Sequence, residues 1–274
     1  MQANWERPVG AQALQGATLV LPVVSVGNTG QLAADLLINS LRLPRAAHLS
    51  DAALLPAVGG QPYAHVHGLA TALELYQDEA ASSSGSTRGT VAVAQQRAPA
   101  APGTQAAFAQ RLAAFVQHAG VKQVLVLGSI EAGLRRDAQL VGPQLRYWAP
   151  DAPSGGPAAA ACGNSAGNEL SDRCAGAGVP PLEPSFFEDR PLEERALQPW
   201  PLLLALRDAG VPCTALLCFS AEGDNLGDAF QLAGGAADVA GLPAPGGSGE
   251  AAAPPQWVPP HTWQHVYGTS TAVY

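Results

Sequence analysis

Apolar and polar positions along the chain alternate between a pattern of strands and a pattern of helices. The run Leu19 to Val24 is continuously apolar and predicts a first buried strand. The segment Gln31 to Leu41 predicts a helix, because leucines recur at near-helical spacing at Leu32, Leu36, Leu37 and Leu41. Asn28, with Gln31 three residues later, fits an N-cap and capping-box pair at the start of that helix.

The next part of the chain predicts three shorter strands and a second helix. A short strand is expected at Ala46 to Leu49. Thr71 to Tyr76 and Thr90 to Gln95 flank a polar segment, QDEAASSSGSTRG, which is typical of a long hairpin connection. Phe108 to His118 repeats the helical spacing, and Gly120 stands at a plausible C′ position for that helix.

The clearest strand in the sequence is VKQVLVLGS, residues 121–129. A continuous run of β-branched residues and leucines is typical of a strand that is covered on both faces. A helix at Pro199 to Ala209 and a strand at Pro212 to Phe219 come later in the chain. Strand, helix and strand in this order imply parallel crossovers. We therefore predict an α/β fold of three layers, with helices on both faces of a mostly parallel central sheet.

Two segments fit neither pattern. Residues 150–181 and 242–255 are rich in alanine, glycine, proline and serine. Such segments lack the large side chains that offset the entropy of ordering a chain. We expect a single domain over residues 1–274, with these two segments as mobile insertions rather than linkers between domains.

Charge and composition restrict the partners. The 14 Lys and Arg against 22 Asp and Glu give a net charge of -8, which disfavours binding to nucleic acid or to anionic membranes. No apolar run approaches the roughly 18 to 20 residues that span a bilayer, and the start MQANWERPVG lacks a signal-peptide core. We therefore expect a protein of the cytoplasm or nucleus, with neither nucleic acid nor membrane as a partner.

The four cysteines do not form a recognisable zinc motif. They stand at positions 162, 174, 213 and 218, without CxxC spacing, and the last two belong to an apolar run that predicts a strand. This arrangement favours free buried thiols.

The turn after the first strand is the first candidate site. It reads SVGNTGQLAA from Ser25 to Ala34 and joins a strand to a helix, as phosphate-binding turns do. A dinucleotide fingerprint needs three glycines, whereas this register gives Ser25, Gly27 and Gly30, so the first glycine is missing. Asp51 stands at about the distance of the acid that binds ribose. A turn that needs glycine for its backbone angles explains the same residues more simply.

Three further groups of residues are weaker candidates for a functional site. His65 and His67 would share one face if their segment were a strand, but no third metal ligand has a recognisable spacing. Ser129 in LGSIEAG is not in a GxSxG motif, so a surface loop is favoured over a nucleophile. Glu222 and Asp224 in AEGDN form a carboxylate pair, which suits acid-base chemistry or the N-terminus of a helix; we favour the helix.

Several segments together resemble the proteasome assembly chaperone 2 family, in the same order along nearly the whole chain. They are VVSVGNTGQLAADLLI, LLPAVGGQPYA, RRDAQL, CFSAEGDNLGDA and WVPPHTWQHVYG. The resemblance implies a non-enzymatic α/β protein with a fold like that of purine nucleoside phosphorylases, without cofactor or metal. It also implies pairing with proteasome assembly chaperone 1 and binding of this heterodimer to proteasome α subunits, promoting ring formation and blocking wrong association.

The residues that match the family's two most specific motifs are candidates for partner binding. They are Gly27, Asn28, Gly30, Glu222, Gly223, Asp224 and Asn225. Both motifs follow core strands, so they are expected to meet at the carboxyl edge of the sheet, where Asn28 caps its own helix and Glu222 or Asp224 accepts hydrogen bonds from the opposing loop. The turn is thus interpreted as a rigid structural or partner-facing element.

The last residues of the chain, YGTSTAVY, are a further candidate. Chaperones that dock on the α-ring typically end in a hydrophobic residue, a tyrosine and one further residue, which insert between α subunits. Here Tyr274 is itself the last residue and follows Val273, which departs from that pattern. We predict a variant insertion by Val273 and Tyr274, with a frayed terminus as the alternative. The rival hypothesis for the whole chain is a nucleoside-processing α/β enzyme that uses the acidic loop and histidines.

Overall fold

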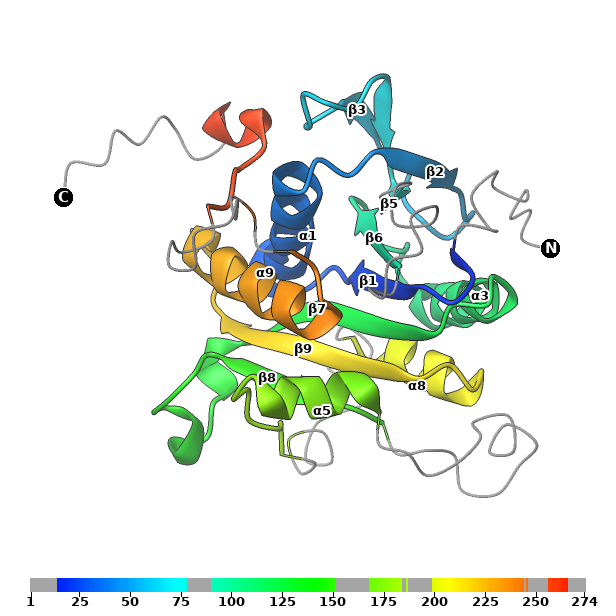
Figure 1. Ribbon diagram of the computed structural model, residues 1–274. Helices are drawn as coiled ribbons and strands as arrows, with labels where there is room; N and C mark the ends of the chain where they lie inside the picture. Colours follow the sequence, from blue (N-terminus) through cyan, green and yellow to red (C-terminus); the bar gives the residue numbers. More distant parts are fainter. Residues whose placement is uncertain are drawn as a thin grey trace.

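Seven strands form the central sheet of the computed structural model (Figure 1), in the spatial order β2-β5-β6-β1-β7-β9-β8. The four middle strands β6, β1, β7 and β9 are parallel to one another. At the edges, β5 is antiparallel to β6, β2 to β5, and β8 to β9. Their bounds are β1 Thr18–Pro22, β2 Arg45–Leu49, β5 Leu73–Gln77, β6 Val91–Gln96, β7 Gln123–Glu131, β8 Leu145–Trp148 and β9 Cys213–Ser220.

The structure describes residues 14–77, 90–150, 168–183, 186, 199–243, 245 and 256–265. Two strands outside the central sheet, β3 (Val58–Gly60) and β4 (Leu69–Thr71), form a small antiparallel pair. Short 3-10 helices are η2 (Val26–Asn28), η3 (Ala132–Leu134), η4 (Asp137–Gln139) and η5 (His261–His265). In this described part of the chain, no helix has the length and apolar character to cross a membrane.

Helices cover both faces of the sheet. Apolar side chains of α1 (Thr29–Ser40), α5 (Glu169–Gly176) and α9 (Leu226–Ala240) pack on one face, and α1 lies beside α9 (Figure 1). Side chains of α3 (Gln105–His118) and α8 (Trp200–Asp208) pack together on the other face. The predicted three-layer α/β fold with a mostly parallel sheet is confirmed.

The strands predicted as buried owe their pattern to this double cover. Every residue of β1 and β9 is buried, as is every residue of β7 except Glu131 at its end. A strand that has helices on both faces has no solvent-facing side, so its sequence does not alternate. The predicted pairing of the strands around residues 71–76 and 90–95 is also confirmed, because β5 and β6 pair in antiparallel register from Leu73 opposite Gln96. Residues 78–89 between them lie outside the described part.

The end of helix α3 follows the prediction. Gly120 has a φ of 68°, which is the left-handed conformation expected at C′. Its amide donates to the carbonyl of Gln117 at 3.0 Å, and the amide of Val121 donates to the carbonyl of Val116 at 3.3 Å. These two bonds satisfy carbonyls at the end of the helix.

The predicted insertion at residues 150–181 is wrong for its second half. Residues 169–176 form helix α5, whose N-cap Asn168 accepts a hydrogen bond from the amide of Leu170 at 3.2 Å. Leu170 and Cys174 are buried on the face that also carries α9, so this short helix belongs to a layer of the fold. Residues 151–167 and most of the second predicted insertion, residues 244 and 246–255, lie outside the described residues.

Candidate functional site

The loops that follow β1, β7 and β9 meet at the carboxyl edge of the parallel strands. The turn after β1 contains the sequence motif with Gly27, and the loop after β9 contains the acidic motif with Asp224. The two motifs touch, because the side chain of Asn225 lies against Gly27. The prediction that they meet at this edge is therefore confirmed.

The turn after β1 has an unusual backbone conformation. Gly27 has a φ of 61° and Asn28 a φ of 53°, so two consecutive residues are left-handed. Asn28 stands at the N-cap of α1, but its side chain makes no capping hydrogen bond. Gln31 instead donates from Nε2 to the carbonyl of Gln96 at 2.8 Å. The predicted capping box is therefore wrong, because a left-handed N-cap residue does not have the extended backbone that the motif uses.

Small hydroxyl side chains tie the turn to the ends of β7 and β9. The hydroxyl of Ser129 contacts Ser25 Oγ at 2.9 Å and donates to the carbonyl of Val26 at 2.5 Å. Thr29 Oγ1 lies 3.0 Å from Ser220 Oγ at the end of β9. Ser129 is fully buried within β7, so the prediction of a surface loop at this residue is wrong. Its hydroxyl holds the turn against the sheet.

Both glycines of the turn are needed for close packing. A Cβ atom added to Gly27 would lie 2.1 Å from Asn225 Nδ2, and one added to Gly30 would lie 2.7 Å from the backbone oxygen of Leu127. Helix α1 thus starts in direct contact with the backbone of β7. Gly30 and Asn225 are buried by the chain's own atoms, which disfavours them as direct partner contacts. A structural role for the turn therefore explains why both positions are glycine.

The acidic loop after β9 is exposed and caps its own helix. Glu222, Gly223 and Asp224 are exposed. Asp224 Oδ1 accepts a hydrogen bond from the amide of Leu226 at 3.0 Å, and Asn225 Nδ2 donates to the carbonyl of Gly223 at 3.0 Å. The contacts of Asp224 are thus with the start of α9 rather than with the opposing turn. A carboxylate at a helix N-terminus is favoured by the helix dipole.

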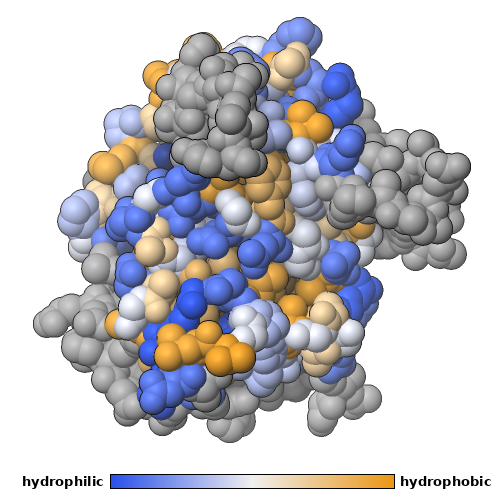
Figure 2. Space-filling model, turned by 90° about the vertical axis from the view of Figure 1, so that its left-hand side faces the viewer, coloured by the Kyte–Doolittle hydropathy of each residue, from blue (hydrophilic) through white to orange (hydrophobic). Residues whose placement is uncertain are grey.

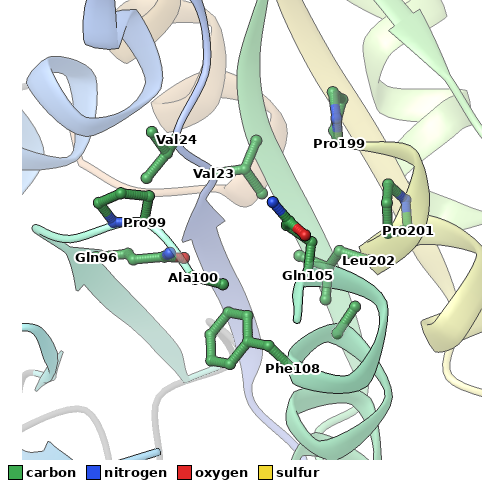
Figure 3. A pocket seen from close by; sticks show the side chains of 11 residues that line it. Val23, Val24, Gln96, Pro99, Ala100, Gln105, Phe108, Pro199, Pro201 and Leu202 are labelled. Carbon is green, nitrogen blue, oxygen red and sulfur yellow. The ribbon is translucent and has the colours of Figure 1, made fainter. Parts of the chain in front are cut away.

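An apolar pocket of about 180 Å³ lies beside this edge, on the α3 and α8 side (Figure 3). Side chains from the segment after β1, from α3 and from the start of α8 converge on it, among them Val23, Val24, Phe108 and Leu202. Gln96 and Gln105 are the polar side chains in its described lining, which holds no titratable group. Such a lining can contact apolar groups but offers no acid, base or nucleophile for a reaction on a substrate.

Apolar residues also stand exposed on the loop that follows β7. Leu140 is 62% exposed and Val141 is 84% exposed, just after η4. The face of the molecule shown in Figure 2 likewise has hydrophobic residues scattered among hydrophilic ones. Single exposed apolar side chains are common on protein surfaces and do not by themselves mark an interface.

A buried cluster of charged and polar side chains lies where β6 ends, between α1, β5 and β6. Asp35 of α1 accepts hydrogen bonds from Tyr63 and Gln95, each at 2.5 Å. Arg97 lies 3.5 Å from Asp35 and 3.6 Å from Glu74, and donates to the Tyr63 hydroxyl at 3.0 Å. Burial raises the pKa of Tyr63 well above its ordinary value of 10, so the phenol remains protonated as a donor to Asp35.

This charged cluster was not found from the sequence. Its members come from a helix, a turn and two strands, and no motif joins them. The one signal in the sequence is Glu74, an acidic residue inside an apolar segment that predicts a strand. Its side chain is fully buried and is held by Arg45 at 3.1 Å and by the Tyr76 hydroxyl at 2.9 Å. The charges of the cluster pair with each other, as buried charges must.

The two histidines of HVH do not share a strand face, so that expectation is wrong. Residues 61–68 form turns. His65 Nε2 lies 3.1 Å from the carbonyl of Leu43, and its ring stacks on Tyr63. The carbonyl of His67 accepts from Arg45 at 2.8 Å. Within the described residues, no group of three or more His, Cys, Asp or Glu side chains could hold a metal ion.

Asp51 forms an ion pair inside the protein, which gives it a structural role. Arg111 of α3 donates from Nε to Oδ2 at 2.7 Å and from Nη2 to Oδ1 at 2.6 Å. The amide of Ala53 also donates to Oδ1 at 2.8 Å. These bonds, led by those from Arg111, hold the pKa of Asp51 below its ordinary value of 3.8. Asp51 thus holds the turn that follows β2 against α3.

We expect the Asp51-Arg111 pair to stabilise the fold at neutral pH and to lose this effect in acid. Because the folded pKa is lowered, the stabilisation is present above the unfolded pKa and disappears as the pH falls through the folded value. Asp51→Asn should lower the free energy of unfolding by about 1 to 3 kcal/mol at neutral pH. Urea denaturation of both chains from about pH 7 to pH 2 measures this, and the difference should shrink below pH 4.

The matched control is Asp208→Asn, an exposed residue of α8 that pairs with its neighbour Arg207 at 2.8 Å. This substitution should change the free energy of unfolding by less than about 0.5 kcal/mol. A difference between wild type and Asp51→Asn that is the same at every pH would contradict a role for the Asp51 charge.

Three of the four cysteines are confirmed as free buried thiols: Cys174, Cys213 and Cys218. Burial raises the pKa of each of these thiols to about 12, so they are protonated and unreactive at neutral pH. Cys162 lies outside the described residues. So do the candidate tail residues Val273 and Tyr274, whose partner-binding role stays a prediction.

Comparison with known proteins gives one consistent family. A family model described as the PAC2 family matches residues 19–231. Proteasome assembly chaperone 2 of Nematostella vectensis is 35% identical over 232 residues, covering 79% of this chain and 86% of that protein. The protein of the same name from Danio rerio is 30% identical over 271 residues and covers 94% of both chains.

Solved structures share the fold at low sequence identity. PbaA of Pyrococcus furiosus, described as an archaeal homolog of proteasome-assembly chaperone, has a TM-score of 0.57 and 14% identity over 84% of each chain. PbaB of the same organism, described as an archaeal proteasome activator, has a TM-score of 0.56 and 18% identity over 87% of this chain and 88% of its own. With the family match over residues 19–231 and the relatives at 30% and 35% identity, the chain belongs to the PAC2 family.

Proposed function

We propose that this chain is a non-enzymatic chaperone of 20S proteasome assembly. In this proposal it pairs with proteasome assembly chaperone 1, and the heterodimer binds the proteasome α-ring, promotes its formation and blocks wrong association. The observation that carries the proposal is the likeness to proteins named proteasome assembly chaperone 2, which extends over 94% of the chain in one relative. The proposal places the protein in the cytoplasm and nucleus.

The geometry of the carboxyl edge supports a role without catalysis. The Asn225 side chain occupies the space beside Gly27 in the turn after β1. The described lining of the adjacent pocket has no titratable side chain. The exposed residues of the two motifs, Asn28, Glu222, Gly223 and Asp224, present polar groups at the surface. We propose these residues, together with Val273 and Tyr274, as contacts with partner proteins.

Co-expression tests the proposal directly. Because the chain has 47% hydrophobic and 13% charged residues, we expect the isolated chain to self-associate. Co-expression with proteasome assembly chaperone 1 of the same organism should give a one-to-one complex by light scattering, and this complex should bind recombinant α subunits. A stable monomer that forms no complex on co-expression contradicts the proposal.

Asp224→Asn separates the chaperone from the rival nucleoside-processing enzyme. Asparagine has the same shape as aspartate and keeps a side-chain oxygen that can accept the bond from the Leu226 amide, so the loop and its polar surface are retained and assembly should be largely intact. The same preparation is assayed for phosphorolysis of inosine and uridine. Turnover of either nucleoside that disappears in a folded Asp224→Asn variant would favour the enzyme.

A further inference from the structure

Two arginines lie against one phenylalanine ring at the carboxyl edge of the sheet. Arg135 belongs to the motif RRDAQL in the loop after β7, and its Cζ atom lies 5.2 Å from the centroid of the Phe219 ring. The Cζ atom of Arg146, in β8, lies 5.6 Å from the same centroid. Phe219 and Arg146 are buried, whereas Arg135 is partly exposed. Two like charges are therefore brought together here, and one of them is open to the surface.

Both guanidinium groups are held by neutral acceptors. Arg135 Nη2 donates to Gln144 Oε1, and it lies 3.5 Å from the carbonyl oxygen of Phe219. Arg146 Nη1 donates to backbone carbonyls, among them that of Leu145 at 2.8 Å. These hydrogen bonds fix the orientation of both side chains but leave their charges uncompensated.

The described part of the chain supplies no ion pair for either arginine. Neither Arg135 nor Arg146 has a carboxylate oxygen within 4 Å among these residues, whereas the buried Arg97 has Asp35 at 3.5 Å. Burial and the neighbouring Arg135 lower the pKa of Arg146, and Glu183 opposes this without forming an ion pair. Buried charges in proteins are normally paired. The two arginines thus form a positive site that lacks its negative partner.

The surface around Arg135 restricts what that partner can be. The green loop between β7 and β8 projects at the edge of the sheet in Figure 1, and it exposes Leu140 and Val141. The neighbouring loop after β9 exposes Glu222 and Asp224. These acidic residues and the net charge of -8 disfavour a polyanion such as nucleic acid. A single carboxylate beside an apolar group suits both the charge and the apolar neighbours.

We infer that the loop around Arg135, Leu140 and Val141 is a docking surface for a segment of a partner protein that carries an Asp or Glu side chain next to an apolar side chain. The carboxylate accepts a charge-assisted hydrogen bond from Arg135, and the apolar side chain packs on Leu140 and Val141. Arg146 lies against the same ring and adds its positive potential. The inference rests on the proposed function, since the segment belongs to a protein with which the chain assembles.

Substitution of Arg135 is the first test. Complexes of the chain with proteasome assembly chaperone 1 are prepared from wild type, Arg135→Met and Arg135→Glu, and two steps are measured: pairing of the two chaperones and binding of recombinant α subunits. Arg135→Met should weaken one of these steps by about tenfold, because a charge-assisted hydrogen bond is lost. Arg135→Glu should weaken the same step by about a hundredfold, because like charges then meet.

The matched control is Arg42→Met, which removes an exposed arginine just after the end of α1. Helix α1 starts at the carboxyl edge, so its end is remote from Arg135. This control should leave both steps unchanged. If Arg135→Glu pairs and binds as well as wild type, the inference is overturned and the proposed function stands. If the wild-type chain neither pairs nor binds, the proposed function is wrong and the inference falls with it.

Salt dependence separates a direct ion pair from a structural role of Arg135. Raising the NaCl concentration from about 50 mM to about 300 mM should weaken the affected step more in wild type than in Arg135→Met, because screening acts on a charge that the variant lacks. A side chain that only shapes its loop would give the same proportional loss in both proteins. That result counts against the inference.

The apolar part of the surface is tested by Val141→Ser. Val141 is 84% exposed, and its burial against a partner should be worth about three- to tenfold in the same step. The control is Val58→Ser on β3, which is 73% exposed and should have no effect. Equal affinities of the Val141→Ser and Val58→Ser proteins would remove the apolar contact from the inference and contradict it.

Urea denaturation of the chain by itself tests whether the missing carboxylate belongs to the chain. Methionine keeps an apolar stem over the Phe219 ring, so Arg135→Met should shift the urea midpoint much less than Arg97→Met, which breaks a buried ionic network. Midpoint shifts of equal size would show that the chain itself pairs the Arg135 charge, and the inference would then be wrong.

Discussion

Arg97→Met should lower the free energy of unfolding by about 3 to 5 kcal/mol, the range expected when one partner of a buried ionic network is removed. Arg97 lies between Asp35 at 3.5 Å and Glu74 at 3.6 Å, and it donates to Tyr63 at 3.0 Å. The Glu74 side chain is fully buried. Without the guanidinium, two carboxylates share a site of low polarity with one less positive charge.

The neighbouring tyrosines cannot replace this charge. Burial raises the pKa of both Tyr63 and Tyr76 above the ordinary value of 10. Each phenol therefore donates one hydrogen bond, to Asp35 and to Glu74 respectively, but remains neutral. Arg45 still pairs with Glu74 at 3.1 Å, so we expect Asp35 to bear most of the loss.

Urea denaturation of four variants beside the wild type tests this account. Arg207→Met, which removes a partly exposed arginine of α8, should lower the free energy of unfolding by less than about 1 kcal/mol. Arg97→Lys should be intermediate, because lysine keeps the charge but loses the planar fork of donors. Adding Asp35→Asn to Arg97→Met should recover part of the loss, since the unpaired charge is removed with its partner. Equal stability of the Arg97→Met and Arg207→Met chains contradicts the account.

The cluster around Arg97 illustrates what the sequence could not predict. Asp35, Tyr63, Glu74 and Arg97 come together because β5 and β6 pair and α1 packs on β6. Long-range pairing of this kind leaves no local pattern. Strands β7 and β9 were predictable, in contrast, because burial on both faces produces a continuous apolar run in the sequence itself.

Among the elements that the sequence analysis missed, α5 and β8 were missed for related reasons. Helix α5 has eight residues and buries two of them, Leu170 and Cys174, so its apolar stripe is too short to show a helical period. Strand β8, with sequence LRYW, lies at the edge of the sheet and has one buried residue, Arg146. The Cζ atom of Arg146 lies 5.6 Å from the centroid of the Phe219 ring. An arginine that covers an aromatic ring reads as a polar position in the sequence.

The candidate site was predicted in position but not in its contacts. Topology places the ends of parallel strands at one edge, so the meeting of the turn with the acidic loop followed from the order of elements. The contacts depend on backbone angles that the sequence does not display. Asn28 has a left-handed φ of 53° and does not cap α1. Asn225, rather than an acidic neighbour, fills the space above Gly27.

Gly27→Val should lower the free energy of unfolding by about 3 kcal/mol, because it adds two costs. The φ of 61° at this residue is unfavourable for a β-branched side chain, which contributes about 1 to 2 kcal/mol. The new Cβ would also lie 2.1 Å from Asn225 Nδ2, and Asn225 is buried and bonded to Gly223. Moving it contributes a further cost of about 1 to 3 kcal/mol.

Two companion variants separate these costs by urea denaturation. Gly27→Asn tolerates the left-handed φ but still meets Asn225, so it should lose about 1 to 3 kcal/mol from the contact alone. Gly27→Val combined with Asn225→Ala removes the contact and should show the backbone cost beyond Asn225→Ala by itself. Gly59→Val is the control, since a Cβ there meets nothing within 4 Å and valine suits a strand. If Gly27→Val unfolds at the same urea concentration as Gly59→Val, the turn does not require glycine at this position. The space that Gly27 leaves for the Asn225 side chain would then contribute nothing measurable to stability at this edge.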